Sequence, residues 1–172
     1  MERRTAIMDS LDQPEWGELC AALARLLDGL ADLRSPWSVR QAAMLDATHD
    51  VESLALQLVN ALVAQRDRDF PDPHTWRLPL ERYPQPDPTH LLAVREWVLS
   101  LGEQSSVPVA RQKRLGSTLT QILVAKAAVE TYSKRLRQAS APDLVRTLAA
   151  LWMLVAECWK LRPLLAGDSS HE

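Results

Sequence analysis

One segment near the end of the chain, residues 142–161, reads PDLVRTLAALWMLVAECWKL. Its proline suits the first turn of a helix, and the stretch from Leu148 to Ala156 contains no polar residue. A helix that is apolar on every side is buried inside a bundle or covered at a subunit interface. We therefore expect a helix from Pro142 to about Leu161 that either lies at the centre of a bundle or contacts a partner.

The composition of the whole chain favours helices. The 172 residues include 29 Leu and 22 Ala but only 2 Ile, 1 Phe and 5 Gly, an inventory rich in helix formers and poor in strand formers. This length is typical of one domain. We predict an all-α fold in which about five antiparallel helices form a bundle, with residues 1–172 as a single helical domain.

Two helices are expected before the middle of the chain. The first lies within residues 1–34, where a capping box begins at Asp12 and leucines then recur at helical spacing. It packs within the bundle or forms an outer arm. Ser35 and Pro36 suit the N-cap and the first position of a second helix, which runs to about Arg66.

The C-terminal helices are expected within residues 89–165. Asp87 is placed to cap the start of a third helix, and Gly102 is placed to end it in the left-handed conformation. Ser105 or Ser106 is the expected cap of a fourth helix. The segment quoted first then follows as the fifth.

The helical pattern stops in residues 67–88. Six of the eleven prolines lie there, and proline removes amide donors and forces an extended backbone. Aromatic residues such as Trp76 and Tyr83 argue against disorder. We favour a strap that these side chains pin across the bundle, and the alternative is a surface that binds a partner.

Several functional classes lack support in the sequence. The longest uncharged stretch, residues 53–65, is shorter than the roughly 20 residues of a membrane-spanning helix, and the first residues lack the apolar core of a secretory signal. Cys20 and Cys158 are too few for a four-ligand zinc site, so we expect two buried thiols. We expect a cytoplasmic protein of bacterial type with no cofactor and no membrane partner.

Two pairs of carboxylate and imidazole side chains are the best catalytic lead. Asp46 precedes His49 by three residues, and Asp87 precedes His90 by the same spacing, as in metal sites of helical bundles. Asp87 is already explained as a helix cap, and a di-iron bundle requires glutamates on two further helices. We expect no metal. Because nucleophile motifs and Gly-rich phosphate loops are also missing, we expect a protein that is not an enzyme.

Charge is distributed unevenly along the chain. Residues 1–90 carry 9 basic and 15 acidic side chains, whereas residues 91–172 carry 11 basic and 7 acidic ones. The clustered cations are Arg111, Lys113, Arg114, Lys134, Arg135 and Arg137. We favour solvated helix ends for these clusters. The alternatives are contacts with nucleic-acid phosphates or docking onto an acidic protein surface.

Tryptophan supplies six of the nine aromatic residues. Trp152 and Trp159 lie one heptad apart on the most apolar helix and therefore share a face. We favour a place in the core for this pair, with a contact patch as the alternative, because tryptophan is enriched at interface hot spots. A protein interface would combine this pair with Trp76 and Tyr83 of the strap.

Two functions remain open. The leading interpretation is a non-catalytic structural or adaptor subunit, which self-associates or binds a protein partner through its last helix and the strap. The alternative is a nucleic-acid-binding small helical subunit of a ribonucleoprotein or DNA-processing complex. That subunit would contact phosphates through the clusters at 111–114 and 134–137.

Overall fold

The structure of the chain is a computed structural model that describes residues 14–77, 83–104, 107–136 and 140–167. These residues contain five α-helices and one short 3-10 helix but no strand, so the predicted all-α fold is confirmed. The elements are α2 (Pro14–Ala31), α3 (Trp37–Asp69), η1 (Pro73–Thr75), α4 (Pro88–Gln104), α5 (Val109–Arg135) and α6 (Ala141–Ala166).

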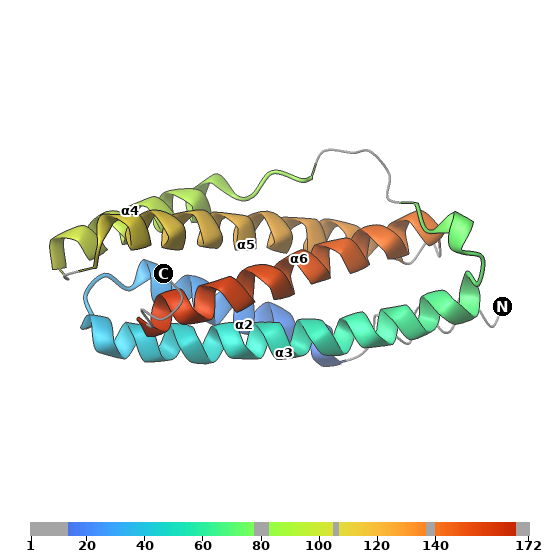
Figure 1. Cartoon of the computed structure of the whole chain (residues 1–172), viewed down its shortest axis with the longest axis horizontal. Coiled ribbons are helices and arrows are strands. Elements are labelled where there is room, and N and C mark those ends of the chain that lie inside the picture. Colours follow the sequence, from blue (N-terminus) through green and yellow to red (C-terminus); the bar gives the residue numbers. More distant parts are fainter. Residues whose placement is uncertain (1–13, 78–82, 105–106, 137–139, 168–172) are drawn as a thin grey trace.

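The five helices form an antiparallel bundle in which α6 lies between α3 and α5 (Figure 1). Helix α6 packs against α5 on one side and against α3 on the other. Helix α4 packs on α5, and α2 packs on α3 and also reaches α4. Each helix runs opposite to the one it packs against most, as Figure 1 shows. The core is a single cluster to which all five helices contribute leucines.

Helix α6 buries leucines against both of its neighbours, α3 and α5. Leu151, Leu154 and Leu161 are almost completely buried. The helix starts at Ser140, whose hydroxyl oxygen accepts a hydrogen bond from the amide of Asp143. It ends at Gly167, which adopts the left-handed conformation with φ of 77°.

The last turn of α6 extends five residues beyond the expected end at Leu161. Two side chains from other helices hold its terminal carbonyls. Gln41 of α3 donates to the carbonyl oxygen of Leu165 at 2.5 Å, and Arg111 of α5 donates through Nε to that of Leu164 at 2.9 Å. These tertiary contacts satisfy carbonyls that have no partner at the end of an isolated helix.

Two expected helix boundaries are wrong. Ser35 does not cap α3; Pro36 is the N-cap residue, and the Ser35 hydroxyl instead hydrogen-bonds to the carboxylate of Asp32 at 2.5 Å. This bond lowers the pKa of Asp32. Gly102 does not end α4, because the helix continues to Gln104. Ser105 and Ser106, the expected caps, lie outside the described residues, and α5 begins after Pro108.

The glycine at position 102 has a packing role instead. A β-carbon at this position would lie 3.3 Å from the side-chain oxygen of Gln112, on the neighbouring helix α5. The amide of Gln112 donates in turn to the carbonyl oxygen of Val107, 2.8 Å away. Gly102 therefore gives Gln112 room to hold the residues that precede α5.

The Pro-rich connection begins where α3 ends, at Asp69, and its described parts hold to the bundle at both ends. The indole N–H of Trp76 donates to the carbonyl oxygen of Phe70 at 2.7 Å, and the guanidinium of Arg66 lies 3.9 Å from the centre of the Trp76 ring. Beyond residues 78–82, which are not described, Pro86 is buried. Figure 1 shows residues 83–87 running beside α5 towards the start of α4.

The two thiols differ in environment. Cys158 of α6 is completely buried, as expected, and burial raises its pKa to about 12. Cys20 is exposed, so the expectation of two buried thiols is wrong for this residue. The buried face of α2 contains Leu19, Leu23 and Leu26, and Cys20 follows Leu19 by 100° around the helix. That rotation places the Cys20 side chain in solvent.

Candidate protein-interaction site

Trp152 and Trp159 lie on the surface of α6. Their exposed fractions are 51% and 67%, so placing this pair in the core was wrong. The buried residues of α6 face α3, α5 and the interior, and the remaining side of the helix is uncovered. In Figure 1, α6 lies at the front of the bundle. The all-apolar stretch of α6 is thus buried on most sides of the helix and exposed on the remaining side.

An apolar stripe follows this uncovered side of α6. Residues spaced three or four apart share one face of a helix. Here they are Val145, Ala149, Trp152, Ala156, Trp159 and Pro163, each exposed or half-buried. We call these six residues the α6 stripe. Over 18 residues the stripe extends for about 27 Å.

Apolar side chains of α3 border the α6 stripe. Glu52 of α3 pairs with Arg162 of α6, which fixes the side of α3 that faces α6. Leu56 and Val63 lie four and eleven residues after Glu52, on the same face of the helix, and both are half-buried. Because α3 and α6 are antiparallel, these side chains continue the apolar surface beside Trp159 and Trp152.

Three ion pairs within the chain lie around the α6 stripe. Arg162 and Glu52 are 2.9 Å apart, and Lys160 and Glu157 are 3.1 Å apart. Farther towards the start of α6, Arg146 and Asp143 form a third ion pair, at 2.9 Å. These three pairs carry no net charge, and an apolar surface bordered by paired charges suits contact with a protein.

A backbone acceptor lies next to the exposed tryptophan at position 159. Pro163 is inside α6 and has no amide hydrogen, so the carbonyl oxygen of Trp159 lacks its usual α-helical donor. The stripe thus combines a large aromatic side chain with a hydrogen-bond acceptor. Tryptophan contacts at interfaces often join apolar area to one hydrogen bond in this way.

The strap residues lie elsewhere. Trp76 is half-buried against the end of α3, where its ring and its N–H are both engaged. Tyr83 is 39% exposed and precedes Pro84, which lines a cavity of about 280 Å³ together with residues of α5. The structure therefore places neither aromatic residue on the α6 stripe. The contacts of Trp76 agree with the strap interpretation.

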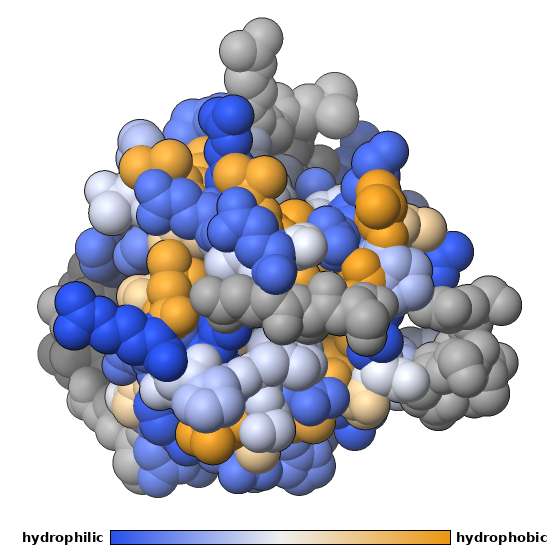
Figure 2. Space-filling view, turned by 90° about the vertical axis from the view of Figure 1, so that its left-hand side faces the viewer, coloured by the Kyte–Doolittle hydropathy of each residue, from blue (hydrophilic) through white to orange (hydrophobic). Residues whose placement is uncertain are grey.

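The two basic clusters lie at opposite ends of α5, and about 35 Å of helix separates residue 111 from residue 134. Arg111 donates to the carbonyl oxygen of Leu164, as described above. Lys113, Arg114, Lys134 and Arg135 are exposed, and Arg137 lies outside the described residues. Figure 2 shows the end of the bundle where α5 begins, and its hydrophobic residues form separate islands among hydrophilic ones. The structure does not bring the two clusters together.

The catalytic lead is dispersed in the fold. Asp46 and His49 are exposed on α3, whereas His90 is half-buried on α4. Asp87 accepts a hydrogen bond from the amide of Thr89 at 2.9 Å, which confirms its capping role and lowers its pKa. Within the described ranges, no three His, Cys, Asp or Glu side chains form a group that fits a metal ion.

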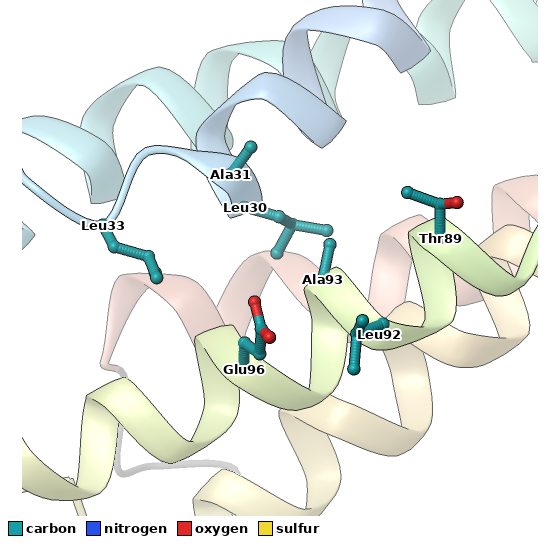
Figure 3. A pocket seen from close by; sticks show the side chains of 7 residues that line it. All are labelled: Leu30, Ala31, Leu33, Thr89, Leu92, Ala93 and Glu96. Carbon is teal, nitrogen blue, oxygen red and sulfur yellow. The ribbon is translucent and has the colours of Figure 1, made fainter.

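A second apolar surface lies between the end of α2 and α4. A cavity of about 210 Å³ opens there, and Figure 3 shows Leu30 of α2 pointing towards Ala93 of α4, whereas Leu92 points away from α2. Its lining is mostly aliphatic, with one carboxylate, Glu96, and one hydroxyl, Thr89. Leu92 and Leu99 of α4 are 53% and 61% exposed. Their heptad spacing matches that of the α6 tryptophans, but each offers much less apolar area.

None of the described helices is long and apolar enough to cross a membrane. Compared with known proteins, the chain matches no protein-family model, no curated protein and no solved structure.

Proposed function

We propose that the chain is a non-catalytic structural or adaptor subunit that assembles with protein through the α6 stripe. The observation that carries this proposal is the exposure of Trp152 and Trp159 on one face of α6. Aromatic side chains bury roughly 150 to 250 Å² each when they are fully covered. Covering the exposed half or more of each ring contributes roughly 2 to 4 kcal/mol per residue at about 25 cal/mol per Å².

The alternative proposal is a nucleic-acid-binding subunit of a ribonucleoprotein or DNA-processing complex. Its cations are Lys113 and Arg114 at one end of α5 and Lys134 and Arg135 at the other. The separation of the two ends and the hydrogen bonds of Arg111 to Leu164 weaken this alternative relative to the α6 stripe.

The leading proposal includes a cytoplasmic location, because unpaired thiols suit a reducing compartment.

The test uses a variant and a control that differ only in the surface they change. Trp152→Ser/Trp159→Ser removes the large side chains of the α6 stripe, and Leu92→Ser/Leu99→Ser removes two exposed leucines with the same spacing on α4. Each chain, carrying a tag, is expressed in its native cells, and its native mass is measured in the lysate by sedimentation.

We expect the wild type and the α4 variant to sediment as an assembly. The tryptophan variant should sediment near the 19.3 kDa of one chain. Equal sedimentation of the wild type and the tryptophan variant would refute the proposed function.

A further inference from the structure

We infer that a second copy of this chain covers the α6 stripe, in an antiparallel pair of α6 helices related by a twofold axis near Ala156. This inference rests on the proposed function and names its partner. Three properties of the surface carry it: its charge, its shape and its size.

The charge of the rim suits a copy of the same surface. Unpaired charges of one sign on this surface would favour a partner of the opposite net charge. Here, however, Glu52 pairs with Arg162 and Glu157 pairs with Lys160. Each of these pairs is neutral, so two copies meet without a net excess of like charge from them. Burial of apolar surface then supplies the attraction.

The order of large and small residues is complementary to itself. Ala156 lies between Trp152 and Trp159, four residues after the first and three before the second, with Ala149 and Pro163 outside them. A twofold axis in the interface plane at the level of Ala156 brings each Trp152 opposite Trp159 of the other copy. The small side chain of Ala156 lets the two helices approach closely at the axis.

The backbone supplies a polar contact for the same arrangement. Trp152 of the second copy reaches the level of Trp159, where Pro163 leaves a carbonyl oxygen without its helical donor. The indole N–H of Trp152 is a donor, and buried indoles usually find an acceptor. Twofold symmetry makes this contact twice.

The size of the face fits a stable dimer. The stripe extends for about 27 Å, and helices packed about 10 Å apart make the face of α3, α6 and α5 about 30 Å wide. These dimensions enclose roughly 800 Å², the area that each partner buries in an interface of standard size. Interfaces of this size have a few hot-spot residues at the centre, where the tryptophans lie.

The experiment combines sedimentation equilibrium of the full chain with disulfide trapping in a Cys20→Ser background. We expect a dimer whose dissociation constant rises at least about 100-fold in Trp152→Ala/Trp159→Ala. Ala156→Cys, at the axis, should form a disulfide-linked dimer on mild oxidation, because small residues at a helix crossing bring α-carbons within disulfide range. Leu92→Cys, on exposed α4, is the matched control and should remain monomeric.

Two results would overturn the inference. One is a wild-type chain that stays monomeric at every concentration. The other is a dimer that links through position 92 as readily as through position 156. A monomer in solution whose assembly in cells still requires Trp152 and Trp159 would refute the dimer and leave the proposed function standing. A failure of the proposed function gives a different result, namely equal sedimentation of the wild type and the tryptophan variant in cell lysates.

Discussion

Replacing Arg111 by alanine tests whether this cation holds the bundle together or serves as a phosphate ligand. Its guanidinium reaches from α5 to the end of α6, where Nε and Nη2 both donate to the carbonyl oxygen of Leu164. The side chain is half-buried and also lies against Gly167, the residue that ends α6. Alanine removes both hydrogen bonds and the positive charge at the negative end of the helix dipole.

The expected loss in the free energy of unfolding is about 2 kcal/mol. Hydrogen bonds that involve a charged group contribute roughly 1.5 to 3 kcal/mol, and part of this value is regained when water solvates the carbonyl of Leu164. For a chain of this length, 2 kcal/mol lowers Tm by roughly 4 to 8 °C. Arg111→Lys keeps the charge but not the forked donors, so its loss should be about half as large.

The measurement is urea unfolding followed by far-ultraviolet circular dichroism, at one protein concentration because assembly raises apparent stability. Lys113→Ala is the control, since Lys113 is exposed two residues away on α5, and it should change stability by less than about 0.5 kcal/mol. Equal unfolding midpoints for Arg111→Ala and the wild type would refute the structural role.

Three further predictions concern other parts of the chain. Ser140→Ala removes the N-cap of α6 and should cost about 1 kcal/mol in urea unfolding, whereas an unchanged midpoint would mean that α6 starts elsewhere. Because the pKa of Cys158 is raised to about 12, the contribution of its neutral thiol to the free energy of unfolding is complete below about pH 9 and is lost as the pH rises towards 12. In Cys158→Ala this part of the alkaline loss of stability should be absent. An equal alkaline loss in that variant would contradict this. In fluorescence anisotropy at physiological salt we expect no binding of labelled oligonucleotides, and salt-sensitive binding that disappears in Lys113→Ala/Arg114→Ala would favour the nucleic-acid alternative.

The helices of this bundle were predictable where local signals decide them. Leucine periodicity located α2, and the prolines of residues 67–88 marked the connection after α3. The end of α6 was not predictable, because Gln41 and Arg111 hold its last carbonyls from helices far away in the sequence. The prediction that Gly102 ends α4 was wrong for a similar reason. The absence of a side chain at this position makes room for Gln112 of α5 and does not serve a left-handed cap.

The candidate site was predictable only in part. The apolar run of α6 indicated either a central helix or an interface, and the structure shows a helix packed between α3 and α5 with one uncovered side. Helical periodicity places Trp152 and Trp159 on one face but does not reveal which face the neighbouring helices cover. The paired charges of the rim depend on contacts between distant residues, such as Glu52 with Arg162, so no local pattern signals them.

The most direct test of the α6 stripe as a contact surface is hydroxyl-radical footprinting of its two tryptophans. The chain is labelled in the assembly isolated from its native cells and, separately, as purified protein diluted until it is monomeric. We predict that oxidation of Trp152 and Trp159 falls several-fold in the assembly, while oxidation of Leu92 and Leu99 stays unchanged. Equal oxidation of both tryptophans in the two samples would contradict the account.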